Sequence, residues 1–371
     1  MFSLQLGNHH RFSTRRRLTK SKKIYPILNL AFKIIVAFAS VGYIGYVIFY
    51  QENEFNNAEN GELIKVNFSY LKKYLLENIS EHPYSLLFIL FTFTLTFANF
   101  ATEILKWKLL MGKLLPVNTK LAIRSVLGGV AASNITPYSL GSYFGRVAQV
   151  PFPYRLKGIS IIFIGDTAQF TSTILMGSSS LFFLIYRSSP DLELFEHQRI
   201  TLLLITGLIV AATIGFIALF LRLKYFAYIM DNLKAFSKVK KIWSVVSKLD
   251  HKKTIGQLLI ICCARLVVIL VQYYLVFQVF GLTINMLDSL LIAATVMAVY
   301  SFIPAINILE FGLTKAGIFL ILLQTFVSPA LATLETTISI ICSLFLIWLM
   351  NLALPSIIGS YHLFKVKLFN H

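Results

Sequence analysis

Four charged side chains lie within or beside long apolar stretches of the sequence, where each needs a partner. Arg265 and Asp166 stand well inside apolar runs, and Arg146 and Glu310 belong to apolar stretches that Pro and Gly interrupt. An ionisable side chain at membrane depth costs about 2.5–3.5 kcal/mol on insertion scales, so it is expected to face a cavity or an opposite charge. These four positions are therefore candidates for a binding site or for buried ion pairs.

Two interpretations of these charges stay open. Arg265 and Arg146 would together receive a lipid phosphate, because a guanidinium group binds phosphate in a bidentate manner and is weakly hydrated. Alternatively, Arg265 and Asp166 would form one buried structural pair. Glu310 could coordinate a proton or a cation beside unwound backbone, whereas the simpler interpretation is a local pair with Lys315.

The composition is typical of a polytopic helical membrane protein. Of the 371 residues, 57% are hydrophobic and 13% are charged, whereas a soluble domain carries about 25% charged residues. Apolar runs of about 18 residues or more recur along the chain, as a hydrocarbon core of ~30 Å requires of a spanning helix. This excludes a soluble enzyme, a secreted disulfide scaffold and a nucleic-acid-binding domain, and predicts an all-α membrane fold.

The net charge of +18 is distributed as a membrane topology requires. Basic residues concentrate in 1–24 and 222–253, whereas 51–84 is acidic. Basic residues beside short cytoplasmic loops form the positive-inside pattern. We therefore expect a bacterial inner-membrane protein with both termini on the cytoplasmic side. The chain divides into a basic tail (1–24), one transmembrane domain (25–360) and a short tail (361–371), with six crossings at about 25–50, 85–106, 157–186, 200–221, 255–280 and 332–357.

Two apolar stretches, 121–150 and 289–326, do not read as simple spans. Gly128, Gly129 and Pro137 interrupt the first, and Pro304 and Gly312 interrupt the second. Broken backbone at membrane depth is tolerated where protein or a water-filled cavity satisfies it, so we expect two re-entrant hairpins. In each stretch a Gly follows the Pro by eight positions. Such paired segments are typical of inverted-repeat transporters, although coincidence remains an alternative.

The segment NITPYSLGSYFGRVAQV (134–150) resembles the first motif of the lysylphosphatidylglycerol synthase transmembrane-region family, also called flippase-like. The span with Arg265 and Gln272 and the segment IPAINILEFGLTKAG (303–317) are similar to later motifs of that family. Two departures are Ser142, where the family usually has Glu, and Thr314-Lys315 after Gly312. The resemblance covers roughly 25–360. It implies a domain that moves a lipid between leaflets. The family-like motifs and the charges in apolar runs together predict a site formed from Asn134, Pro137, Gly141, Gly145, Arg146, Asp166, Arg265, Gln272, Glu310, Gly312 and Lys315.

We therefore expect a non-enzymatic lipid transporter for an anionic or polyprenyl-phosphate-linked lipid, with membrane lipids as partners and neither nucleic acid nor cofactor. The alternatives are a lipid-binding or scaffold factor for envelope synthesis, and a polytopic glycosyl or phospholipid transferase. The seven His are scattered and the three Cys lie in apolar runs, so no metal site is expected. Glu103 and Lys106 are interpreted as anchors at the end of a span. Asn99 is expected to form a hydrogen bond with a neighbouring helix.

Overall fold

The part of the protein that the structure describes is built almost entirely from helices. The computed structural model describes residues 53–56, 63–66, 68–81, 84–134, 136, 139–187, 199–220, 252–303, 313–331 and 333–365. The helices are α2 (Phe68–Glu81), α3 (Ser85–Met111), α4 (Thr119–Ser133), α5 (Gly141–Ala148), α6 (Phe152–Arg187), α7 (Arg199–Phe220), α10 (Lys252–Val279), α11 (Met286–Tyr300), α12 (Leu313–Phe326), α13 (Leu334–Trp348) and α14 (Leu354–Phe364), with a 3-10 turn at Pro329–Leu331 and a π-helical turn at Leu349–Ala353.

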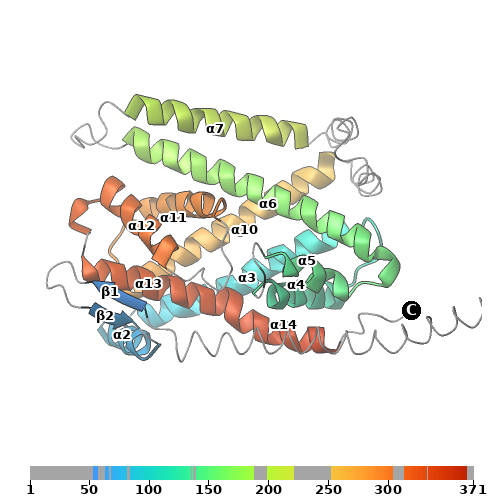
Figure 1. Cartoon of the computed structure of the whole chain (residues 1–371), viewed down its shortest axis with the longest axis horizontal. Helices are drawn as coiled ribbons and strands as arrows, with labels where there is room; N and C mark the ends of the chain where they lie inside the picture. The colour runs from blue at the N-terminus through green and yellow to red at the C-terminus, as the bar shows by residue number, and fades with distance from the viewer. Residues whose placement is uncertain are drawn as a thin grey trace, which may run out of the picture.

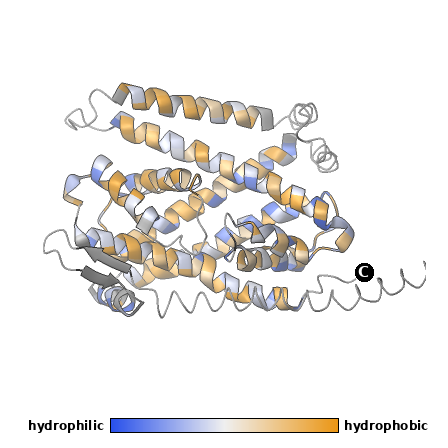
Figure 2. Ribbon diagram, in the orientation of Figure 1, coloured by the Kyte–Doolittle hydropathy of each residue, from blue (hydrophilic) through white to orange (hydrophobic). Residues whose placement is uncertain are grey.

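Five of these helical segments are long and apolar enough to cross a membrane. They are α3, α6, α7, α10 and the continuous helix from α13 through α14, and each covers one of the predicted crossings. The remaining predicted crossing, 25–50, lies outside the described residues. Figure 2 shows apolar residues along most of α7, which packs on α6 at one edge of the bundle (Figure 1). The helices thus have the character of a membrane protein.

One local difference from the expected all-α fold lies before the second crossing. Strands β1 (Asn53–Asn56) and β2 (Leu63–Val66) pair antiparallel. Residues 63–66 read Leu-Ile-Lys-Val, and β-branched residues favour strands. Helix α2 follows these strands and fills most of the rest of the acidic segment 51–84.

Both interrupted stretches form a helix, a break and a second helix. In the first stretch, α4 has 15 residues and α5 has eight; in the second, α11 has 15 and α12 has 14. At 1.5 Å per residue, even 15 residues reach only about 22 Å, less than a ~30 Å hydrocarbon core. Helix α4 runs through Gly128 and Gly129 without a break, contrary to the expectation. Pro137 and 304–312 lie outside the described residues.

Glycine lets α5 and α14 approach α4 closely. A Cβ on Gly145 would lie 2.3 Å from the carbonyl oxygen of Gly128, and one on Gly359 would lie 2.0 Å from that of Leu127. Small residues are what allow helix backbones to pack tightly inside a membrane. The close contact between α4 and α5 therefore sets the position of Arg146, the cationic residue of α5.

A proline shapes the last spanning helix. Pro355 has no N–H to donate to the carbonyl of Asn351 four residues earlier, and the backbone forms the π-helical turn Leu349–Ala353 just there. Such turns are frequent at functional sites. The turn places Asn351 beside α3 and α10, where its side chain is hydrogen-bonded to both.

Candidate functional site

Glu103 of α3 is the centre of a buried cluster of charges. Its carboxylate lies 2.6 Å from Nη1 of Arg146 on α5, 2.8 Å from Nη1 of Arg265 on α10 and 2.9 Å from Nζ of Lys106 on its own helix. Only 3% of the Glu103 side chain is exposed. Three helices are therefore joined through one carboxylate.

Asp166 of α6 forms the other anionic part of the cluster. One of its oxygens lies 3.8 Å from Nζ of Lys106, and 35% of its side chain is exposed. The Tyr143 side chain on α5 lies near the same carboxylate. Two carboxylates thus face three cationic groups, so the cluster carries a formal charge of three minus two, or +1.

A chain of neutral polar groups holds Arg265 in place. Its Nε donates to Oδ1 of Asn99 at 2.9 Å, and Nδ2 of Asn99 donates to Oδ1 of Asn351 at 2.8 Å. Nδ2 of Asn351 donates in turn to Oε1 of Gln272 at 3.2 Å. Gln272 then donates to Thr92 and Thr96 on α3, each at 3.1 Å. The predicted interhelical hydrogen bond of Asn99 is confirmed.

The cluster opens into a polar cavity of about 260 Å³ between α3, α4, α5, α6, α10 and the π-helical turn. Arg146, Asp166 and Arg265 line it together with the hydroxyl-bearing residues Ser133, Ser139 and Ser142. Ser139, in the turn before α5, has a φ of 54°, a left-handed conformation that is unfavourable for residues other than Gly, Asn and Asp. Glu103 lines the cavity as well, so two arginines and two carboxylates face it, and the extra positive charge of the cluster belongs to the buried Lys106.

The structure brings together Arg146, Asp166 and Arg265, three of the charged residues predicted for the site, and it places several of the uncharged predicted residues around them. Asn134 is buried and donates to the hydroxyl of Ser356 at 2.7 Å. Gly141 and Gly145 lie at the contact between α4 and α5. Gln272 is fully buried behind Asn99 and Asn351. These residues shape and support the cavity, and Pro137 lies outside the described residues.

Lys315, which the structure describes in the second interrupted stretch, does not line this cavity. Lys315 of α12 is 8% exposed, and its Nζ lies 5.3 Å from the ring centre of Tyr273 and 5.2 Å from that of Tyr300. These distances allow cation–π attraction. Glu310 and Gly312 lie outside the described residues, so the proposed pair between Glu310 and Lys315 is outside them as well.

Two sequence interpretations are wrong. The first is the pair between Arg265 and Asp166: Arg265 pairs with Glu103, and Asp166 pairs with Lys106. The second is the role of Glu103 and Lys106 as exposed anchors, because each is only 3% exposed. Their spacing was the available signal, since a Glu and a Lys three residues apart share one helix face.

Asn351 was missed altogether as a site residue. The signal in the sequence was its place four residues before Pro355 inside an apolar span, because a proline frees the carbonyl four residues earlier.

Ion pairs at this depth constrain what the site can do chemically. A buried charge that loses its partner is strongly destabilising, so Glu103 keeps the three cations in place when no other anion is present. Among the described residues, no group of three His, Cys, Asp or Glu side chains could hold a metal ion. Two arginine side chains that line one cavity can bind an anion such as a phosphate.

No protein-family model, curated protein or solved structure matches the chain. The resemblance to the flippase-like family thus stays a prediction that depends on the quoted motifs alone.

Proposed function

We propose that this chain is a membrane transporter that binds the anionic headgroup of a lipid and moves the lipid between leaflets. The observation that carries the proposal is a polar cavity into which two arginines, Arg146 and Arg265, both face. Its wall includes α3, α6 and α10, which are apolar and long enough to span a membrane. A membrane interior offers few anions other than lipid headgroups. A lipid phosphate or phosphodiester is therefore the ligand that matches this site.

The two arginines would share the recognition of the phosphate. Arg265 is residue 14 of the 28 in α10 and keeps 26% of its side chain exposed, so it lies near the middle of its span and is accessible from the cavity. Arg146 approaches from α5, and Glu103 lies between them. Because arginine binds phosphate through a planar fork of donors, a lysine at either position would keep the charge but lose this geometry.

Movement between leaflets is supported by the depth of the cavity and by the two interrupted helix pairs. Transporters with discontinuous helices bind their substrates near the midplane, where the ends of such helices meet. The first helix pair, α4 and α5, contributes Arg146 and three serines to the cavity. The second pair, α11 and α12, would provide the corresponding element on the opposite side.

Arg265→Lys tests the proposal directly. The full chain is reconstituted into phosphatidylcholine vesicles containing a little phosphatidylglycerol with a fluorescent tail, and the outer leaflet is bleached with dithionite. We expect rapid loss of the protected signal with the wild-type protein and a several-fold slower loss with Arg265→Lys. Arg187→Lys is the matched control, because Arg187 is half-exposed and pairs with Asp288 elsewhere in the fold.

The outcome separates the candidate functions. Equal movement of labelled phosphatidylcholine and phosphatidylglycerol would contradict recognition of an anionic headgroup. Wild-type rates with a well-folded Arg265→Lys protein would remove Arg265 from the mechanism. Binding of phosphatidylglycerol without movement would instead identify a lipid-binding factor.

A further inference from the structure

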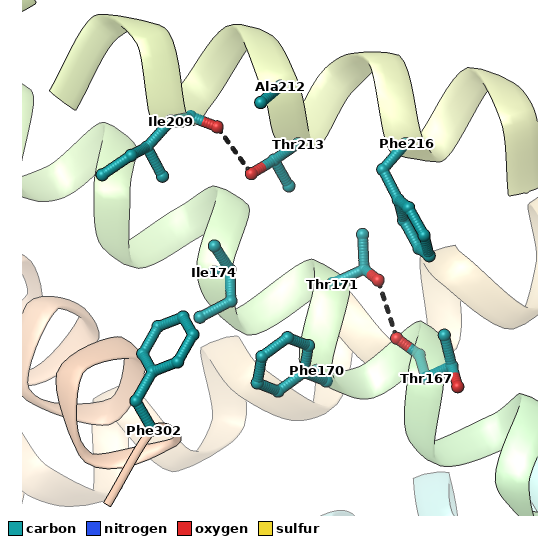
Figure 3. Close-up of a pocket in the computed structure, with 9 residues that line it drawn as sticks. All are labelled: Thr167, Phe170, Thr171, Ile174, Ile209, Ala212, Thr213, Phe216 and Phe302. Atoms are coloured by element: carbon teal, nitrogen blue, oxygen red, sulfur yellow. Dashed lines mark hydrogen bonds between the residues drawn. The ribbon is translucent and has the colours of Figure 1, made fainter. Parts of the chain in front are cut away.

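A second cavity of about 310 Å³ lies between α6 and α7. Figure 3 shows the residues that line it: Thr167, Phe170, Thr171, Ile174, Ile209, Ala212, Thr213, Phe216 and Phe302. Phe302 follows α11, and its ring meets that of Phe170 edge-on with the ring centres 5.6 Å apart. The cavity thus has walls from two spanning helices and an aromatic contact at one end.

The surface of this groove is apolar despite its three threonines. The hydroxyl of Thr167 donates to the carbonyl of Phe163 at 2.8 Å. The hydroxyl of Thr171 donates to Thr167 and that of Thr213 donates to Ile209, each at 2.7 Å (Figure 3). Because each hydroxyl is satisfied by its own helix, the groove offers a ligand mainly methyl groups and aromatic rings.

The groove is accessible rather than part of a closed core. Phe302 is 68% exposed, Phe170 is 44% exposed and Ile209 is 42% exposed. Helices α6 and α7, which carry Phe170 and Ile209, are both long and apolar enough to span a membrane, so a groove between them would open toward hydrocarbon. An apolar cavity of about 150 Å³ already holds a molecule of benzene, and this groove is about twice as large.

Helix α6 connects the groove to the charged cavity. Asp166 lines the charged cavity, and Phe170, one turn later on α6, lines the groove. At about 100° per residue, Phe170 lies only ~40° around the helix from Asp166 and Ile174 lies ~80° around. The two cavities therefore occupy neighbouring faces of one helix, and Asp166 and Phe170 lie about 6 Å apart along its axis.

We propose that the groove between α6 and α7 holds one hydrocarbon chain of the lipid whose headgroup enters the charged cavity. The inference rests on the proposed function, since it takes the headgroup site as given. Lipid tails are as apolar as the groove, so transfer from bilayer to groove gains little hydrophobic free energy. The groove acts by shape: it holds a chain beside the headgroup site and orients the lipid as it leaves the bilayer.

Photo-crosslinking of the full chain tests this proposal. The probe is phosphatidylglycerol with a diazirine midway along one acyl chain, used in phosphatidylcholine vesicles, and the labelled residues are mapped by mass spectrometry. In the wild-type protein we expect labelling concentrated on 167–174, on 209–216 and at Phe302. This measurement needs no variant, so it decides the matter even if a substituted protein fails to fold.

A substitution in α7 then fills the groove. Ala212→Trp places an indole into it, and we expect several-fold less labelling of these segments. Ala211→Trp is the matched control, because Ala211 is an equally exposed neighbour on α7 that does not line the groove. The control should label like the wild type. Neither variant touches Arg146 or Arg265, so retention of labelled phosphatidylglycerol at the headgroup site should persist in both.

The other outcomes of these experiments would refute either the groove proposal or the headgroup site. Chain labelling spread evenly over all lipid-facing helices, with selective movement of phosphatidylglycerol intact, would refute the groove and leave the proposed function standing. Equal groove labelling by a phosphatidylcholine probe would show only surrounding bilayer lipid and would also refute the groove. If the wild-type protein moved phosphatidylglycerol no faster than phosphatidylcholine, the headgroup site would be refuted, and the groove proposal with it.

Discussion

Glu103→Gln is the most informative single change, because it keeps the shape of the side chain and removes the negative charge shared by three cations. In the wild-type protein, Arg146, Arg265 and Lys106 all lie within 2.9 Å of this carboxylate. Lys106 is 3% exposed and Arg146 is 11% exposed. After the change, Asp166 alone, 3.8 Å from Lys106, would balance the cluster.

The expected cost follows from the burial of these groups. Breaking a buried ion pair by removing one partner costs about 3–5 kcal/mol, because the remaining charge is left uncompensated. The three contacts of Glu103 are coupled, so their energies do not add. Water can enter the cavity and Asp166 remains nearby, so we expect about 3 kcal/mol. That corresponds to roughly a hundredfold change in the unfolding equilibrium constant.

The free energy of unfolding is measured on the full chain in detergent micelles by reversible denaturant titration. Glu77→Gln is the matched control, because Glu77 also pairs with a lysine, Lys73, at 3.7 Å, but is 53% exposed. Exposed pairs of this kind contribute less than about 1 kcal/mol. If Glu103→Gln cost no more than Glu77→Gln, the three cations would be hydrated, and the argument for a tightly coupled cluster would be refuted.

Three further predictions concern the topology, the position of Arg146 and a helix cap. Single cysteines at positions 60, 192 and 285 should react with an impermeant thiol reagent from outside, and those at 10, 240 and 368 from inside. Gly129→Ala should slow phosphatidylglycerol movement, because its Cβ would lie 2.5 Å from Cγ of Arg146 and displace that side chain. Asn285→Ala should cost about 1 kcal/mol of stability, because its side chain caps α11 at 2.8 Å from a first-turn N–H.

Each of these predictions has its own control. Labelling of position 240 from outside would overturn the orientation with both termini inside. Gly215→Ala has no atom within 4 Å of its new Cβ, so transport should be unchanged; equal slowing by both alanines would show a general effect. Thr283→Ala, at an exposed position just before the cap, should change stability by less than about 0.5 kcal/mol. An equal loss from Asn285→Ala and Thr283→Ala would contradict the capping role.

Much of the helical framework can be predicted from the sequence, because each spanning segment must be apolar over a length fixed by the bilayer. The runs at 85–106, 157–186, 200–221, 255–280 and 332–357 all became spanning-type helices. The interrupted stretches 121–150 and 289–326 likewise contain helices too short to span a membrane, α4 and α5 in the first and α11 and α12 in the second. Such features are local, since they depend on the composition of a single segment.

What the sequence could not decide is which charges meet. Arg265, Asp166 and Arg146 were recognised individually, because a charge in an apolar run is conspicuous by itself. Their partners depend on the rotation and depth of four helices, and one residue along a helix turns a side chain by about 100°. Only the tertiary structure therefore shows that Glu103 lies between Arg146 and Arg265. The sequence places this carboxylate near the end of a span, whereas the fold places it at the centre of the charge cluster.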